Sequence, residues 1–484
     1  MENVASVKPG IIAVSRDCFP KSLAERRREA VAKEYGAGMY NCKKIVESEN
    51  DIPAALKELA ENGVNALIVF LGNFGPEGPE TILAKTFPGE VMFAAAAEES
   101  ASTLQDGRGD AYCGMLNAGY NIGLRGIRAY IPEYPVGSPR EIAAMIREFI
   151  PIARTLLSLK SLKIISFGPR PADFYACNAP IKCLYDMNIE LEENSELDLL
   201  AAFNKRSDDK RIPAIEKEMA AELGEGNLYP GILSRLAQYE LTLSDWCAEH
   251  KGSREYVAIA AKCWPAFQSE FKFVPCYVNG RLAAKGLPVA CETDIYGALS
   301  EYIITAATLQ PAMLLDINNT VPADMAKNIA GYRPEELFMG FHCGNGSACC
   351  MKKPSMKYQK IMHSLLEPGK EPDITRGTLE GDINPGKITI FRLQAGADAQ
   401  PAAYIAQGEV VDSPTNTFGT TGIFGIKEMA RFYRHVLIEQ RFPHHTAVGQ
   451  GHSGKYLFEV MKALNVPVSY NRPKALPYPR ENIF

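Results

Sequence analysis

Two acidic residues stand where carboxylates often bind ligands. Glu292 closes the apolar run "PVACE", Asp316 closes "AMLLD", and a helix-length segment separates them. In open α/β sheets, ligands bind beyond the carboxyl ends of the strands. If the two strands are neighbours joined by that helix, both carboxylates emerge at one edge of the sheet. Carboxylates so close repel each other unless a proton or a cation lies between them, so the pattern predicts a divalent metal site.

A histidine near the end of the sequence could complete this site. The segment "FPHHTAVGQGHSGK" (442–455) contains three of the seven histidines, and His445 could supply a neutral imidazole. Ligation by several oxygens and one nitrogen suits Mn²⁺ or Mg²⁺ better than a structural zinc ion. We therefore predict that Glu292, Asp316 and His445 hold Mn²⁺ or Mg²⁺. The alternatives are that the acids are helix N-caps or surface residues and that the histidines lie in a solvated loop.

The same segment also matches phosphate-binding patterns. "GQGHSGK" (449–455) satisfies both G-x-G-x-x-G and G-x-x-x-x-G-K. Tyr456, however, stands where a Ser or Thr would hold Mg²⁺, and Lys474 stands where an acid would hold a ribose. We therefore predict a tight turn followed by a helix rather than a nucleotide site.

The twelve cysteines are scattered along the chain, without the dense spacing of a small disulfide scaffold. The stretch "HCGNGSACC" (342–350) is similar to a metal knuckle but lacks the Cys-x-x-Cys pairs of a zinc site. We expect most cysteines to be reduced and buried, with Cys349 and Cys350 packed in the core.

The composition indicates a soluble, multidomain globular protein. The chain has 484 residues, of which 46% are hydrophobic and 23% are charged. A formal net charge of −5 argues against a nucleic-acid partner. The first residues lack the features of a signal peptide, and no apolar run approaches the ~20 residues that span a bilayer. We therefore expect a cytoplasmic protein without a membrane partner.

The elements that would position the site begin with an α/β domain over residues 1–160. Strand patterns such as "GIIAVS" (10–15) and "NALIVFLG" (65–72) alternate with helix patterns, which predicts a mostly parallel sheet covered on both faces. Ser138 and Glu141 form a capping box that opens a long helix.

Two further domains are expected after this helix. The strand "LKIISFG" (162–168) restarts the alternation, and helical patterns follow over 208–223 and 228–250. We predict a second α/β domain over 161–306. Residues 307–484 hold several strand patterns separated by Gly- and Pro-containing loops, which predicts a β-rich domain.

The ordered set of motifs resembles the L-fucose and L-arabinose isomerase family, and the L-fucose branch more closely. "PVACETDIYGALS", "LLDINN" and "HHTAVGQGHSGK" are similar to the segments that carry the family's metal-binding Glu, Asp and His, at Glu292, Asp316 and His445 here. "FHCGN" (341–345) resembles the family's Trp-His-Cys-Gly-Asn stretch, with Phe341 in place of the Trp.

The resemblance implies two α/β domains, a β-rich third domain and an active site between the second and third. It also implies a homo-oligomer, a hexamer or a trimer, in which a neighbouring subunit's first domain closes the site. Arg16 and the loop over 72–80 would be the neighbour's contribution.

The implied reaction is aldose–ketose isomerisation of a sugar through a cis-enediol, with a metal-chelated substrate. Glu292 and Asp316 would move the proton between C2 and C1 while also binding the metal. Further candidate contacts to the sugar are Trp264, Gln268, His342 and His444.

Two other classes of function remain as alternatives. Paired α/β domains also form the clefts of non-catalytic sugar-binding or sensor proteins, although such a cleft has no need of an acid pair with a histidine. A nucleotide-dependent enzyme is the third hypothesis. The sequence leaves the sugar open: a pentose, a deoxyhexose such as L-fucose, or an anionic sugar such as a sulfonated hexose.

Overall fold

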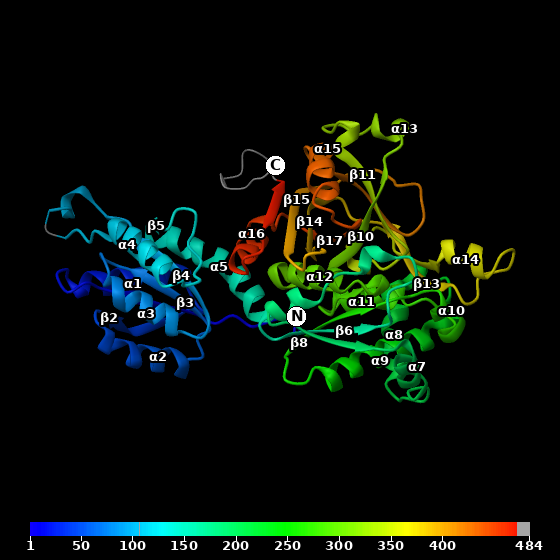
Figure 1. Cartoon of the computed structure of the whole chain (residues 1–484), viewed down its shortest axis with the longest axis horizontal. Helices are drawn as coiled ribbons and strands as arrows, with labels where there is room; N and C mark the ends of the chain where they lie inside the picture. The colour runs from blue at the N-terminus through cyan, green and yellow to red at the C-terminus, as the bar shows by residue number, and fades with distance from the viewer. Residues whose placement is uncertain (106, 472–484) are drawn as a thin grey trace. The chain divides into compact units, whose positions relative to one another are not determined.

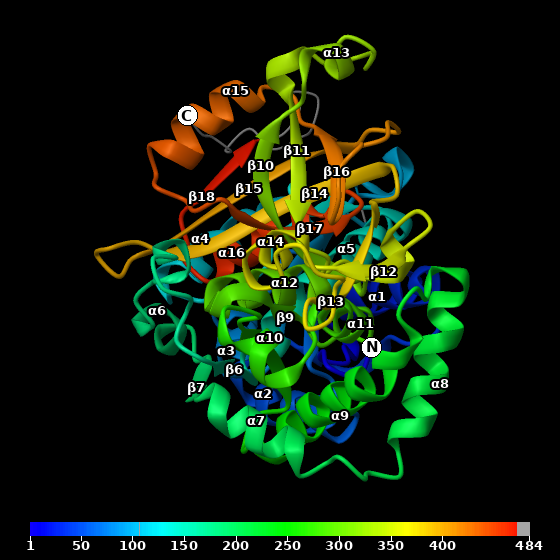
Figure 2. The same ribbon diagram turned by 90° about the vertical axis from the view of Figure 1, so that its right-hand side faces the viewer.

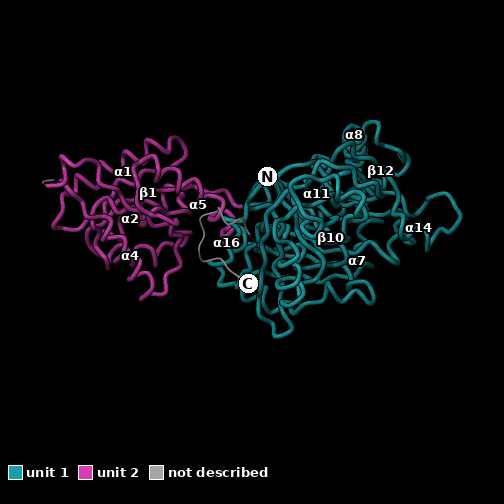
Figure 3. The backbone as a smooth tube through the Cα atoms, turned by 90° about the horizontal axis from the view of Figure 1, so that it is seen from above, with its two compact units in different colours: residues 1–4, 158–484 teal, residues 5–157 magenta. Residues whose placement is uncertain are grey.

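The computed structural model describes residues 1–105 and 107–471. The chain divides into two compact units, shown by colour in Figure 3: residues 5–157 form one, and residues 1–4 together with 158–484 form the other. Among the described residues, no helix combines the length and the apolar character needed to cross a bilayer.

The unit of residues 5–157 is built on a five-stranded parallel sheet of order β2-β1-β3-β4-β5. The strands are β1 Pro9–Val14, β2 Tyr40–Val46, β3 Ala66–Leu71, β4 Glu90–Ala96 and β5 Val136–Gly137. Every residue of β1, β3 and β4 is buried, as expected where helices cover both faces of a parallel sheet.

Helices separate these strands, as Figure 1 shows. They are α1 Lys21–Tyr35, α2 Ile52–Glu61, α3 Glu77–Thr86, α4 Ala111–Leu124 and α5 Pro139–Leu159. The predicted capping box opens α5, because Glu141 accepts hydrogen bonds from the backbone N–H and the hydroxyl of Ser138. The α/β character predicted for this part of the sequence is confirmed.

The other unit begins with a four-stranded parallel sheet of order β7-β6-β8-β9. Its strands are β6 Leu162–Phe167, β7 Glu190–Asn194, β8 Tyr256–Ala261 and β9 Val289–Ala290. The helices of this part are α6 Lys182–Asp186, α7 Glu196–Asn204, α8 Ile212–Leu223, α9 Leu233–His250, α10 Ala266–Phe271, α11 Cys276–Ala284 and α12 Ile295–Thr308.

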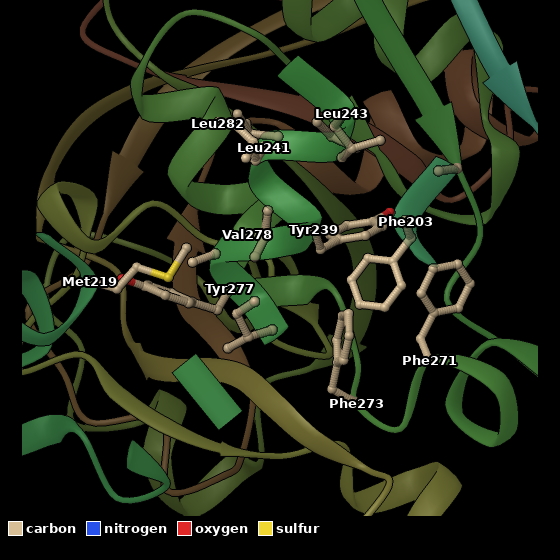
Figure 4. Packing of buried hydrophobic residues seen from close by; sticks show 14 of the residues in the cluster. Phe203, Met219, Tyr239, Leu241, Leu243, Phe271, Phe273, Tyr277, Val278 and Leu282 are labelled. Carbon is tan, nitrogen blue, oxygen red and sulfur yellow. The ribbon is translucent and has the colours of Figure 1, made fainter. Parts of the chain in front are cut away.

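An aromatic core holds these helices against the sheet (Figure 4). Phe203 of α7 lies 5.2 Å from Phe271, measured between ring centroids, and Tyr239 of α9 packs edge-on against Phe267, Phe271 and Phe273. Aromatic pairs of this kind add about 0.5–1.5 kcal/mol each beyond the area they bury. This core fixes α10 and α11, which precede the turn that carries Glu292.

A nine-stranded sheet of order β12-β13-β16-β11-β10-β17-β14-β15-β18 follows, and pairing of β15 with β16 closes part of it into a barrel. The strands are β10 Ala312–Thr320, β11 Leu337–His342, β12 Ser355–Tyr358, β13 Arg376–Asp382, β14 Gly386–Ala395, β15 Pro401–Val410, β16 Thr420–Gly425, β17 His445–Gln450 and β18 Val468–Asn471. The helices here are α13 Ala323–Ala326, α14 Lys360–Leu366, α15 Met429–Phe432 and α16 Gly454–Ala463, with a π-helical segment Tyr433–Ile438 after α15.

Helix α12 lies between the two sheets of this unit, in contact with β6 and β8 on one side and β10, β14 and β17 on the other (Figure 2). The predicted fold class, two parallel α/β sheets followed by a β-rich part, is confirmed. The division at residue 306 stays a prediction. The sequence suggested that the strands before Glu292 and Asp316 could be neighbours in one sheet. They are not, because β9 and β10 belong to different sheets.

Two local predictions have different outcomes. The glycine-rich segment is a turn at Gly451, which has φ of 81°, between β17 and α16, as predicted; Lys474 lies outside the described residues. Cys350 is buried in the barrel core, but Cys349 is exposed, so the prediction that both are packed is wrong. The two residues share a 3-10 turn, with their sulfur atoms 3.9 Å apart, but only Cys350 packs into the core.

Candidate metal and active site

The antiparallel pairing of β10 with β17 brings Asp316 and His445 together. The two residues are direct cross-strand partners, and cross-strand partners have side chains on the same face of a sheet. His445 Nε2 lies 3.5 Å from Asp316 Oδ1, and His444 Nε2 lies 3.7 Å from the same oxygen. His445 begins a strand and is buried, so the alternative of a solvated loop does not describe it.

Glu292 reaches the same place from a strained turn after β9. The 3-10 turn Cys291–Thr293 holds Glu292 at φ 60° and Thr293 at φ 57°, in the left-handed region. Such conformations cost of order 1–3 kcal/mol each and persist where the surrounding structure imposes them. The Thr293 hydroxyl donates to the carbonyl oxygen of Phe167 at 3.2 Å, which ties the turn to the end of β6. Glu292 Oε2 then lies 3.1 Å from His445 Nε2.

The buried ring nitrogen of His445 gives a test of whether a cation fits. Nε2 makes no hydrogen bond, although carboxylate oxygens of Glu292 and Asp316 lie 3.1 Å and 3.5 Å away. A buried nitrogen without a hydrogen-bond partner is costly, whereas an ion held between these donors would satisfy it. Ligand atoms of Glu292, His342 and His445 lie within 4.8 Å of one another, as do those of Asp316, His444 and His445. The two groups share His445, so Glu292 and Asp316 each belong to a possible metal-binding cluster that includes this histidine.

A buried chain of charges orients His445 from behind. Its Nδ1 lies 2.8 Å from Asp294 Oδ2, and Arg392 holds Asp294 through two contacts of 2.5 Å and 2.9 Å. Gln394 in turn accepts from Arg392 Nε at 3.0 Å. A carboxylate on the second ring nitrogen fixes the orientation of the ring and leaves Nε2 facing the cluster.

This chain of contacts also sets the protonation of the groups in it. Burial alone would raise the pKa of Asp294, but Arg392 and His445 outweigh burial and hold that pKa well below its usual range. Burial would lower the pKa of His445, yet its hydrogen bond to Asp294, together with the nearby Cys177 and Glu292, raises that pKa well above its usual range. For Glu292, burial favours the neutral acid, but His445 and His342 lower its pKa, so Glu292 is ionised at neutral pH.

The other residues predicted to contact the sugar, apart from Arg16, all belong to this unit, and their surroundings differ. Trp264 Nε1 donates to Glu292 Oε1 at 3.2 Å. His342 is buried at the end of β11, where Nδ1 accepts the N–H of Cys343 at 2.9 Å, and burial lowers its pKa and that of His444. Gln268 is fully buried on α10, and within the described part of the chain its amide has no hydrogen-bond partner.

Arg16 belongs to the other unit, so the structure does not place it at this cluster. It follows β1, lies 3.6 Å from Glu77 and stacks over the ring of Phe74 at 4.8 Å. Arg16 and Glu77 line a cavity of about 320 Å³. Its role in a neighbouring subunit's site stays a prediction.

Sequence reasoning missed four residues at the cluster: Phe174, Cys177, Asp294 and Arg392. The ring of Phe174 lies 5.5 Å from His444 and 5.9 Å from His445, between ring centroids, and Cys177 Sγ lies 3.8 Å from His445 Nδ1. One signal was present for Arg392, since a charged residue interrupts the apolar strand "KITIFRL". Phe174 and Cys177 lie at a short 3-10 turn, Tyr175–Cys177, that no sequence pattern connects to the site.

The fold and this cluster together define an α/β protein with a carboxylate–histidine site suited to a divalent cation. Residues 10–160 match the family model for the N-terminal domain of fucose/sulfoquinovose isomerases, and residues 340–472 match that for the C-terminal domain of L-fucose isomerase. The chain belongs to the L-fucose isomerase family.

Several curated relatives carry the name sulfoquinovose isomerase. The protein of Alkalicoccus urumqiensis is 26% identical over 341 residues, which cover 69% of this chain and 70% of that protein. The protein of Priestia megaterium is 25% identical over 336 residues, covering 68% and 69%. That of Clostridium sp. (strain MSTE9) is 25% identical over 299 residues, covering 60% of each.

Proposed function

We propose that this chain is a metal-dependent aldose–ketose isomerase that acts on a sugar. The observation that carries the proposal is the convergence of Glu292, Asp316 and the unpartnered Nε2 of His445 at one point. Membership of the L-fucose isomerase family and the names of the relatives support the same reaction class. The donor set of two carboxylates and one imidazole favours Mn²⁺ or Mg²⁺.

In the proposed reaction, the residues of this chain move a proton between two sugar carbons. Glu292, which is ionised, takes the proton from C2 of the aldose while O1 gains a proton, which gives a cis-enediol of the sugar. Glu292 or Asp316 then delivers a proton to C1 while the O2 hydroxyl loses its proton, so that the net change moves one proton from C2 to C1 and one from O2 to O1. Trp264 holds Glu292 Oε1, which leaves Oε2 directed at the cluster. A divalent cation, when bound, supplies the positive charge that makes the C2 proton acidic.

Two neutral histidines suit the binding of sugar hydroxyls. Burial keeps the pKa of His342 and of His444 below the usual range, so each ring presents one donor and one acceptor at neutral pH. A cavity of about 1000 Å³ adjoins His444, and Asn318, which donates to Asp316 at 3.3 Å, lines a second of about 460 Å³. Spaces of this size accept a monosaccharide.

The substrate we propose is a deoxyhexose, a pentose or a related sugar, with a sulfonated hexose included because the relatives are named for one. The direct test is a panel of these sugars incubated with metal-stripped protein, with and without added Mn²⁺, and with ketose formation measured. Conversion of one class of sugar in this panel would identify the substrate class. Binding of sugars without conversion at any metal concentration would favour the alternative, a non-catalytic sugar-binding protein.

The working form that we propose is a homo-oligomer, a hexamer or a trimer. Arg16 and the segment 72–80, whose last four residues form the start of α3 instead of the expected loop, would complete a neighbouring subunit's site, as the family resemblance implies. An Arg16→Ala variant should then lose activity but, when mixed with a Glu292→Gln variant, recover part of it, because some sites would combine the intact residue of each chain. Absence of any recovery in exchanged oligomers would place Arg16 outside the site.

A further inference from the structure

Among the three exposed cysteines, Cys18, Cys113 and Cys349, the last has a second thiol beside it. Cys349 Sγ lies 3.9 Å from Sγ of the next residue, Cys350, which is buried in the barrel core. Cys113, by contrast, donates to the carbonyl oxygen of Asp110 at 3.1 Å. Cys349 therefore offers the solvent a thiol that has another thiol directly behind it.

Hydrogen bonds on both sides hold the two thiols in this relation. The N–H of Cys350 donates to the carbonyl oxygen of Ser347 at 2.9 Å, which closes the 3-10 turn. The Ser347 hydroxyl donates to the carbonyl oxygen of Gly280 on α11 at 2.7 Å. From the other side, Asn384 donates its side-chain N–H to the carbonyl oxygen of Cys349 at 3.2 Å and its backbone N–H to that of Cys350 at 2.9 Å. The turn thus keeps one sulfur in the core and the other at the surface.

The contact between the sulfurs makes the two thiols unequal. Hydrogen bonding from Cys350 lowers the pKa of Cys349 to about 7, although partial burial and the charge of Glu222 act in the opposite direction. The same contact, together with burial, raises the pKa of Cys350 well above its usual range. At neutral pH about half of the Cys349 side chains are therefore thiolates, whereas Cys350 keeps its proton.

An exposed thiolate in contact with a second thiol is suited to reaction with peroxides. The thiolate is the nucleophile, and oxidation of cysteines follows thiolate character and exposure. A neighbouring thiol then converts the first oxidation product into a disulfide. The buried Cys42 and Cys247 have neither property, because burial raises the pKa of each to about 12. Cys349 combines exposure, thiolate character and a neighbouring thiol.

We propose that Cys349 and Cys350 form an oxidation site for hydroperoxides, which shares no residue with the metal cluster and does not depend on the proposed reaction. The Cys349 thiolate attacks one peroxide oxygen, so that an S–O bond forms and the O–O bond breaks. The departing oxygen takes up a proton and leaves as water or an alcohol. The Cys350 sulfur releases its proton and attacks the Cys349 sulfur, which forms the S–S bond and expels the sulfenic oxygen as water.

The overall change is balanced and reversible. Two thiols and one hydrogen peroxide give one disulfide and two water molecules, and the two electrons that the sulfurs lose reduce the peroxide. The sulfurs must approach from 3.9 Å to about 2.0 Å. Because Cys350 is held in the core, the exposed Cys349 supplies this movement. Exposed disulfides are the readily reduced kind that serves in regulation, so a thiol reductant should restore the pair.

Oxidation of the full-length protein with equimolar hydrogen peroxide, followed by alkylation of the remaining thiols in denaturant and by mass spectrometry, tests the site. We expect a disulfide between Cys349 and Cys350 that dithiothreitol removes, while Cys18 and Cys113 are still alkylated. Fragmentation of the peptide distinguishes the pair from Cys343, which lies on the same tryptic peptide. Oxidation of Cys18 and Cys113 before the pair, or a disulfide from Cys349 to any other cysteine, would overturn the proposal.

Two variants assign the roles of the thiols. Cys349→Ser, at an exposed position, should stay folded and leave Cys350 reduced after peroxide treatment. In Cys350→Ala, dimedone should trap a lasting sulfenic acid at Cys349, and alkylation of native protein at Cys349 should slow by on the order of 10-fold at neutral pH, because an ordinary thiol has a pKa of about 8.5. Cys113→Ser is the matched control and should form the disulfide at the wild-type rate. Oxidation of Cys350 without Cys349, or an unchanged alkylation rate in Cys350→Ala, would show that the two thiols do not act as a pair.

Discussion

Asp294 is the residue whose removal best tests how the site is positioned. Asp294→Asn keeps the shape of the side chain but removes the charge that faces both Arg392 and His445. Loss of a carboxylate behind a metal-binding histidine typically costs 10- to 100-fold in metal affinity. It also leaves Arg392, which is fully buried, without a charge partner, and breaking a buried pair costs about 3–5 kcal/mol of the free energy of unfolding.

A second variant separates these two effects. Asp294→Asn combined with Arg392→Met removes both charges, so most of the lost stability should return, whereas Mn²⁺ affinity should stay low because His445 still lacks its carboxylate. Urea unfolding gives the stability, and competition with a chelator gives the affinity. Asp245→Asn, which removes a carboxylate of α9 that pairs with Arg206 and Arg211 rather than with the cluster, is the control and should leave Mn²⁺ affinity unchanged. Wild-type affinity in the single variant, or restored affinity in the double variant, would show that Asp294 does not position His445 for metal binding.

Three further predictions concern separate parts of the molecule. Burial raises the pKa of the Glu80 carboxyl from 4.5 to about 8. Between these two pH values the native protein keeps a proton on Glu80 that the unfolded chain has lost. The free energy of unfolding should therefore fall by about 1.4 kcal/mol for each pH unit of increase. Glu80→Gln should remove that slope in urea titrations, and parallel slopes would contradict it. Trp264→Phe should reduce kcat by about 10- to 100-fold, through loss of a hydrogen bond to ionised Glu292, with little change in thermal stability; unchanged kinetics would show that this bond is dispensable. Phe203→Ala should cost about 3–5 kcal/mol in urea unfolding, whereas Leu197→Ala on the same helix should cost under ~0.5; equal costs would be inconsistent with the packing in Figure 4.

The parts of the fold that the sequence predicts are those with strong periodicity. The β1 and β3 strands are continuous apolar runs because both faces of their sheet are covered, and this signal is local. The strand β2, "YNCKKIV", was not predicted, because it mixes polar and apolar residues without a clear period. The contact between β15 and β16 that closes the barrel depends on long-range pairing, which no local pattern encodes.

In the candidate site, too, the residues could be predicted from local sequence signals, but the contacts that bring them together could not. Glu292, Asp316 and His445 were selected by residue type and position, and the structure brings them together. The route differs from the expectation, because the left-handed turn at Glu292 and the β10–β17 pairing replace a shared sheet edge. Asp294 was passed over because an acid before a helix has an ordinary role as an N-cap, which it also performs, accepting from the N–H of Gly297 at 2.8 Å.

A titration of metal-stripped protein with Mn²⁺, in which bound metal and sugar conversion are followed together, shows whether the site at His445 is a metal-dependent active centre. We expect one ion per chain, conversion that rises in proportion to occupancy, and loss of metal binding in His445→Ala. Glu292→Gln should remain folded and lose turnover. Full conversion by the metal-free protein, or undiminished turnover in Glu292→Gln, would show that the isomerisation does not depend on a metal ion and Glu292 at this site.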